Sequence, residues 1–301
     1  MSHIHARRLA ASATAVALAT AAVVTAAPAP AAPRAAARVT SQTATAPTVH
    51  IAVGAASYVR MRTHLHPGTQ RFVVTAGGRA ALQLVRPRAG YTRAELARDA
   101  NRGLAHGKVP ALRRFERNTE LIGGVEARPG HPGIFWLHLR RGTYYALDTN
   151  PTALLARKIR TIHVTGSLRT TRPPRPTAVI RAVHEHTWAR LPRTIPRSGV
   201  LAWRNRATDN HFIAMARLLP GKTIADWKTW VDKAAAGQDP GPEPVDESVG
   251  FDTAVVAPGH GMSQRYSAPA GNYVLVCFWP DADMGGAPHA FMGMWRAIHL
   301  R

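Results

Sequence analysis

The sequence is poor in cysteine, lysine and acidic residues. It contains one cysteine, Cys277, in 301 residues, so no intramolecular disulfide can form, although disulfides are common in exported proteins. The chain has 39 lysines and arginines, of which only five are lysine, against 17 aspartates and glutamates. Its formal net charge is +22. Such a charge favours contact with an acidic protein or an anionic cell-wall polymer, and a merely solvated basic surface is the simpler alternative.

Motifs of common catalytic sites are missing as well. The chain has no Gly-x-Ser-x-Gly, no His-Glu-x-x-His and no phosphate-binding loop. No pair of carboxylates can be assigned to one face of an element, so hydrolytic chemistry lacks support. We therefore expect a protein that is not an enzyme, with no catalytic residues.

Long apolar runs are confined to the N-terminus. Arg7 and Arg8 precede an apolar stretch over 9–27, a pattern that predicts a cleavable signal peptide with either Sec or twin-arginine export. An Ala/Pro-rich spacer follows, and we assign 1–47 to signal and spacer together. No later segment supplies the roughly 20 apolar residues of a membrane span. We predict a secreted, extracytoplasmic protein without a transmembrane segment, for which nucleic acid is not a partner.

The rest of the chain contains one pattern twice. A shift of 131 positions aligns the stretch around Gly90 with that around Gly221, and a shift of 129 aligns Gly130 with Gly259 inside matching Pro-Gly-His turns. Self-similarity over a domain-sized period indicates tandem duplication. We predict two copies of one domain, over 48–168 and 178–301, joined by a Pro-rich linker over 169–177.

Each copy is predicted to be mostly β. Short runs rich in β-formers are separated by glycine and proline, and each copy carries one helix that begins with a capping box. These boxes pair Thr92 with Glu95, and Thr223 with Asp226. The predicted fold class is all-β dominated: two tandem Greek-key β-sandwiches, each with one inserted α-helix.

Metal-binding residue types gather near the C-terminus. Strand alternation in "GNYVLVC" places Cys277 on the inward face, and His289 and Met294 follow in "PHAFMGM". His211 begins an earlier strand, directly after a polar turn. Two imidazoles, one thiolate and one thioether are the ligand set of a blue-copper site.

These stretches resemble the cupredoxins. "GNYVLVC" is similar to their Gly-x-Tyr-x-x-x-Cys strand, and "PHAFMGM" is similar to their Pro-His…Gly-Met loop. The resemblance implies one type-1 copper ion held by His211, Cys277 and His289, with Met294 as the axial ligand or Met292 in its place. It further implies electron transfer or copper handling in a secreted cupredoxin-like protein.

One departure from the family concerns the loop between the thiol and the second histidine. Eleven residues separate Cys277 from His289, whereas plastocyanin-type loops carry only a few. The loop must fold back for His289 to reach the thiol. If the loop does not fold back, His289 caps a turn and cannot form a trigonal ligand set with His211 and Cys277. Asp281 and Asp283 in this loop have two further interpretations, a hard oxygen cluster or a solvated turn.

The N-terminal copy serves as an internal control. Under the repeat alignment, His211 falls on Ala80, Cys277 on Asp148, and Met294 on Lys158. All candidate ligands are missing together there. This pattern favours a metal site in the C-terminal copy alone, and the alternative is that the four residues are incidental in both copies.

The copper-protein interpretation has two alternatives. A resemblance to multicopper oxidases would imply four His-x-His pairs, one of them bracketing the cysteine. After the predicted signal peptide this chain has two such pairs, His64–His66 and His184–His186, and Cys277 lies in neither. We do not expect oxidase activity. The other alternative is a metal-free secreted β-sandwich at the cell surface, acting as a binding or structural module, in which Cys277 is a small buried hydrophobe.

Overall fold

The computed structural model describes residues 46–151, 153–169 and 171–301. The predicted signal peptide and nearly all of the spacer lie outside these ranges. Inside them, no helix is long and apolar enough to cross a membrane.

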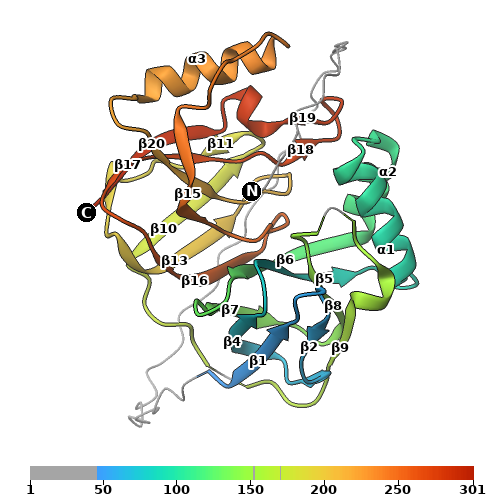
Figure 1. The fold of residues 1–301 in the computed structure, drawn as a ribbon. Helices are drawn as coiled ribbons and strands as arrows, with labels where there is room; N and C mark the ends of the chain where they lie inside the picture. The colour runs from blue at the N-terminus through green and yellow to red at the C-terminus, as the bar shows by residue number, and fades with distance from the viewer. Residues whose placement is uncertain (1–45, 152, 170) are drawn as a thin grey trace, which may run out of the picture.

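The chain alternates many short strands with few helices (Figure 1). The elements of the N-terminal copy are β1 (Thr48–Val53), β2 (Val59–Arg60), β3 (His64–Leu65), β4 (Gly68–Ala76), β5 (Ala80–Pro87), α1 (Arg93–Ala100), the π-helical turn η1 (Asn101–Ala105), α2 (Val109–Asn118), β6 (Thr119–Ala127), β7 (Gly133–Leu139), β8 (Gly142–Asp148), the 3-10 turn η2 (Ala156–Lys158) and β9 (Arg160–Val164). Those of the C-terminal copy are β10 (Ala178–His184), β11 (Thr187–Trp188), β12 (Thr194–Ile195), β13 (Ser198–Asn205), β14 (Ala214–Leu218), α3 (Ile224–Ala235), β15 (Val245–Asp252), β16 (Gly261–Ser267), β17 (Gly271–Val276), β18 (Pro280–Asp281), β19 (Ala287–Pro288), the 3-10 turn η3 (His289–Met292) and β20 (Trp295–Leu300).

The two copies repeat one strand order. In the N-terminal copy the orders are β2-β1-β4-β7 and β3-β9-β8-β5-β6. In the C-terminal copy they are β11-β10-β13-β16 and β12-β20-β17-β14-β15, the same sequence of equivalents. Each copy therefore has two sheets, and the predicted β-dominated pair of sandwiches is confirmed. The residue limits of the two domains stay a prediction.

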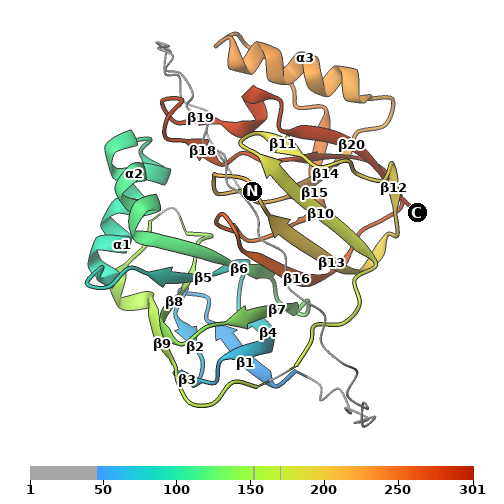
Figure 2. The same ribbon diagram turned by 180° about the vertical axis from the view of Figure 1, so that it is seen from behind.

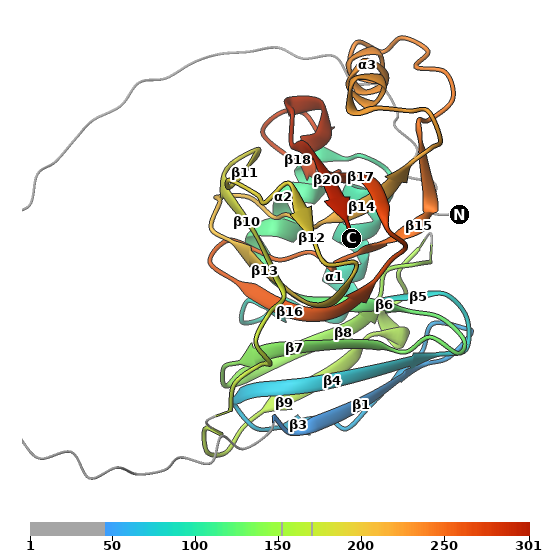
Figure 3. The ribbon, with the colours of Figure 1, turned by 90° about the vertical axis from the view of Figure 1, so that its left-hand side faces the viewer.

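The copies are joined edge to edge by one sheet. Strands β7 and β16 pair antiparallel and fuse two sheets into an eight-stranded one within the described ranges. Phe135 pairs with Gln264, which is its own equivalent under the shift of 129 positions. A strand that pairs with its own repeat implies a local two-fold axis between the copies. Figures 2 and 3 show β16 lying beside β7 where the two halves meet.

Strand β17 is buried on both faces, as the alternation of its residues requires. Leu275 belongs to the main core, and Val274 and Val276 belong to a second apolar cluster beneath α3. On α3, Trp227 and Val231 complete that cluster, so the helix covers the outer face of the sheet.

The N-terminal copy has two α-helices where one was predicted. Helix α1 begins with the predicted capping box of Thr92 and Glu95, and α3 begins with that of Thr223 and Asp226. Helix α2 was missed because its N-cap, Lys108, makes no side-chain cap bond and no capping box marks its start. Its buried face is held by Ala111, Leu112 and Phe115.

Asp252, at the end of β15, makes the stability of the fold depend on pH. Burial raises its pKa to about 7, and nearby Glu126 adds repulsion. An unfolded aspartate titrates near pH 3.9, so the stability that Asp252 contributes is full below about pH 4 and is lost as the pH rises through about 7. We expect Asp252→Asn to raise the free energy of unfolding by about 1–2 kcal/mol at pH 8 and to change nothing at pH 4. Urea denaturation at both pH values measures this, and an equal gain at both would contradict it.

Candidate metal centre

Two of the predicted ligands meet at one end of a strand pair. Strands β14 and β17 are antiparallel, with Ala214 opposite Val276. His211 precedes Ala214, and Cys277 follows Val276, so both side chains leave the same end of the ladder. The sheet register brings the segment that carries this imidazole to the segment that carries the thiol.

The backbone of His211 is fixed independently of its ring. Its N–H donates to the carbonyl of Val256 at 3.2 Å, and the Val256 N–H donates back at 2.8 Å. The amide of Asn205 donates to the Val256 carbonyl at 2.7 Å and to the Asp209 carbonyl at 2.6 Å. Backbone bonds on both sides hold the histidine at the start of its strand.

The eleven-residue loop folds back. Strands β18 and β19 form a short antiparallel ladder, and the Asp281 carboxylate accepts the N–H groups of the second and third residues after it. The N–H of His289 then donates to the carbonyl of Trp279 at 3.0 Å. Asp283 is exposed and ion-paired with Arg113, so it forms no oxygen cluster with Asp281. The loop returns the second imidazole to the thiol.

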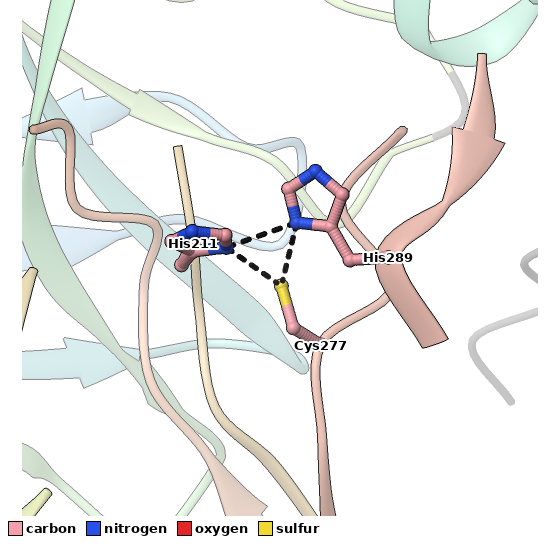
Figure 4. Close-up of side chains that lie close together, drawn as sticks. All are labelled: His211, Cys277 and His289. Carbon is pink, nitrogen blue, oxygen red and sulfur yellow. Dashed lines mark hydrogen bonds between the residues drawn. The ribbon is translucent and has the colours of Figure 1, made fainter. Parts of the chain in front are cut away.

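The three donors form a compact triangle (Figure 4). The Nδ1 atoms of His211 and His289 lie 2.9 Å apart, and each lies 3.7 Å from Sγ of Cys277. All three residues have 0% exposure. Donors on one ion at about 2.1 Å for nitrogen and about 2.3 Å for sulfur lie at most about 4.2 to 4.4 Å apart. Every edge is shorter, so one metal ion fits all three donors.

Burial sets the protonation of the donors. It lowers the pKa of His211 to about 2 and that of His289 to about 3, so both imidazoles are neutral ligands at ordinary pH. It raises the pKa of the Cys277 thiol to about 12, opposed by N–H donation from Phe212 and Trp279. A bound cation displaces the thiol proton. Thiolate with two imidazoles is the donor set of type-1 copper.

Met294 completes a His2CysMet set. Its carbonyl accepts the N–H of Cys277 and its N–H donates to the carbonyl of His289, both at 3.1 Å. Its side chain is fully buried, whereas Met292 lines a surface cleft. Left-handed Gly293, at φ +88°, makes the turn that lets one residue bond to both ligands. The C-terminal copy thus holds one type-1-copper-like site.

The N-terminal copy supports this site without supplying a ligand. Glu116 on α2 accepts a hydrogen bond from Nε1 of Trp279 at 2.7 Å and one from the Asn210 amide at 3.4 Å. Trp279 lies two positions after Cys277, and Asn210 directly precedes His211. Figures 1 and 2 show α2 beside the β18–β19 loop. No local sequence pattern indicated this contact.

Two residues next to the site were not predicted. His186 lies edge-on to the ring of His289, with centroids 4.8 Å apart, and Asp209 lies in the same group of side chains. His186 belongs to a His-x-His pair that the sequence interpretation set aside. Nothing in its spacing pointed to the site, because His186 and His289 lie 103 positions apart in the sequence and come together only through side-chain contacts in the folded chain.

In the N-terminal copy, Asp148 replaces the thiol. Its Oδ1 accepts the N–H groups of Ala81 at 2.9 Å and Asn150 at 3.0 Å. The position that holds a metal donor in one copy thus caps a turn in the other.

No protein-family model matches the chain, and no curated protein matches it in sequence. Among solved structures, it is similar to dithionite-reduced auracyanin from Roseiflexus castenholzii, with 20% identity and a TM-score of 0.27 over 42% of this chain and 97% of that one. It is similar to auracyanin B, with 17% identity and a TM-score of 0.26 over 43% and 93%. A copper-containing nitrite reductase from Thermus scotoductus gives 12% identity and a TM-score of 0.22 over 85% and 68%. The β-dominated architecture predicted from the sequence is confirmed by the strand order of this chain, and the site assignment rests on its own donor geometry.

Removal of the Glu116 carboxylate, which is not a metal ligand, should lower the affinity of the site for copper. Glu116→Ala leaves the Trp279 and Asn210 donors without an acceptor, and losses of this kind typically weaken metal affinity about tenfold. Glu116→Gln, which keeps one acceptor, should lie between. Copper affinity is measured by competition with a chelator. Glu120→Ala, which removes a half-exposed carboxylate of β6 that lies near Arg86 and His260 and not near the metal ligands, is the matched control. Equal affinities for both alanine variants would contradict the supporting role.

Proposed function

We propose that the protein binds one copper ion in its C-terminal copy and serves in electron transfer or copper handling. The observation that carries this proposal is the triangle of His211, Cys277 and His289 donors, all buried and within 3.7 Å of one another. The alternative of a metal-free module leaves unexplained why the only thiol faces two neutral imidazoles.

The fold of the chain would hold the donor atoms of the copper ion in fixed positions. The bound ion would provide a one-electron Cu(II)/Cu(I) couple. The sheet register fixes His211 and Cys277, and the loop ladder fixes His289, so the donors keep their places when charge changes. Burial excludes water from all three donors. Met294 would supply the thioether of the ligand set, since its backbone bonds hold this buried residue next to both Cys277 and His289.

We propose that the protein is not an oxidase. His64 lines a cleft of the N-terminal copy, and His184 and His186 line a different cleft of the C-terminal copy. The two His-x-His pairs therefore do not converge on one cluster.

We further propose export through the predicted signal peptide and contact with an anionic partner. A cleft of about 620 Å³ in the N-terminal copy, here called the basic cleft, supports this contact. No acidic residue lines it, and within the described ranges its five cations make no ion pair. These cations are Arg60, Arg93, Arg157, Lys158 and Arg160.

The copper proposal is tested by spectroscopy of the mature protein. One equivalent of Cu(II) should give an intense visible thiolate-to-copper band, because Cys277 is the only thiol. Cys277→Ser should keep its fold, judged by circular dichroism, and lose the band. Met292→Leu, a change on the same loop outside the ligand set, should retain it. A colourless wild type without any thermal shift on adding copper would reject the proposal.

The basic cleft is tested with inorganic polyphosphate as an anionic probe. Arg60→Ala combined with Arg157→Ala should weaken binding about fivefold at low salt, since each exposed contact contributes up to about 1 kcal/mol. The wild-type affinity should fall steeply with ionic strength. The matched control combines Arg181→Ala with Arg265→Ala, which removes two exposed charges elsewhere. An equal loss in both double variants would mean that net charge, and not the cleft, binds the polymer.

A further inference from the structure

A second group of potential ligands lies beside His289. Each of His186, Asp209, Asp281 and His289 offers one ligand atom, and these atoms lie within 4.8 Å of one another. They come from four separate places: the turn between β10 and β11, the loop before His211, strand β18 and turn η3. The copper interpretation uses only one of the four.

His289 has an unused nitrogen. Its Nδ1 faces Cys277 and His211, and the other ring nitrogen points away from them (Figure 4). That atom, Nε2, is buried and has no hydrogen-bond partner. An unpaired buried polar group is costly, about 1–3 kcal/mol, so a partner is expected on this side. The His186 ring lies 4.8 Å from the His289 ring.

The chemistry of the group suits a cation. Nε2 of His186 lies 2.9 Å from Oδ2 of Asp281, and Asp209 adds a second carboxylate. Two imidazoles and two carboxylates are ligands that zinc accepts in tetrahedral sites. Donors on one ion at about 2.1 Å lie at most about 4.2 Å apart, so the group must close by about half an ångström.

We propose that His186, Asp209, Asp281 and His289 form a second metal site, for a divalent cation of the zinc class, that shares His289 with the copper site. The two carboxylates balance the charge of the ion. A cleft of about 440 Å³, lined by His184, Glu185, His186 and Met292 among others, gives the ion a path from solvent.

Sharing His289 makes the two sites communicate. With both ions present, its ring carries no proton on either nitrogen. The Nε2–H bond breaks, the nitrogen binds the second ion, and the proton passes to water in the cleft. Only this bridging rests on the proposed copper function; the three remaining ligands do not depend on it.

The test titrates zinc into copper-loaded protein and measures both metals after gel filtration. We expect one further equivalent of zinc per chain and a shift of the thiolate-to-copper band as it binds. Asp209→Asn combined with Asp281→Asn should keep the copper band and lose the zinc. Asparagine at 281 retains the Oδ1 acceptor that caps the loop. Asp283→Asn, in the same loop but outside the group, should bind zinc as the wild type does.

If the double variant does not fold, His186→Gln replaces it, because His186 contacts Oδ2 of Asp281 and leaves the Oδ1 atom that caps the loop in place. A wild type that takes up no second metal would overturn the site. Equal zinc uptake in the wild type and in the Asp209→Asn, Asp281→Asn or His186→Gln variant would also overturn the second site.

A variant that lacks the copper ligands distinguishes failure of the copper proposal from failure of the second metal site. In His211→Ala, Cys277→Ser protein, checked for folding by circular dichroism, we expect one equivalent of zinc that disappears when His186→Gln is added. Zinc uptake there without any copper band in the wild type would retain the second site and reject only the bridge. No uptake in this folded chain would count against the second site.

Discussion

The metal centre depends on one constraint, the return of the long loop after Cys277. The β18–β19 ladder and the bond from the His289 N–H to the Trp279 carbonyl close that loop. A further bond joins the Cys277 N–H to the Met294 carbonyl. All of these are backbone contacts, so they form whatever occupies the site. The donors are therefore placed before any metal binds, which lowers the cost of ordering them.

Duplication has left the copies with different tasks. In the N-terminal copy, Asp148 caps a turn where the thiol would be, and no ligand set remains in its described residues. That copy nevertheless extends the C-terminal sheet through β7 and sends Glu116 to the segments that carry both His211 and Cys277. A copy without metal chemistry is thus part of the support for the metal site. This explains in physical terms why the two are packed and not separate on a linker.

Local patterns in the sequence predicted most of the fold and the ligand set. The capping boxes at Thr92 and Thr223 and the inward face of Cys277 follow from neighbours within a few positions, and the repeat follows from comparing the two halves of the chain. Helix α2 was not predicted because its N-cap, Lys108, makes no side-chain cap bond. Glu116 and His186 escaped because their roles depend on contacts between distant segments. The return of His289 was open for the same reason: its spacing allowed the loop to close but did not require it.

Burial explains why these residues are metal donors and not ordinary core groups. Neutral imidazoles and a protonated thiol are each placed where water does not reach, and the Nε2 atoms of His211 and His289 make no hydrogen bond. Burying such groups without partners destabilises a fold. A cation that binds the folded chain and not the unfolded chain raises the free energy of unfolding and so offsets this destabilisation. The polar centre of the C-terminal core is therefore a cost that metal binding offsets, which favours the copper interpretation over the metal-free one.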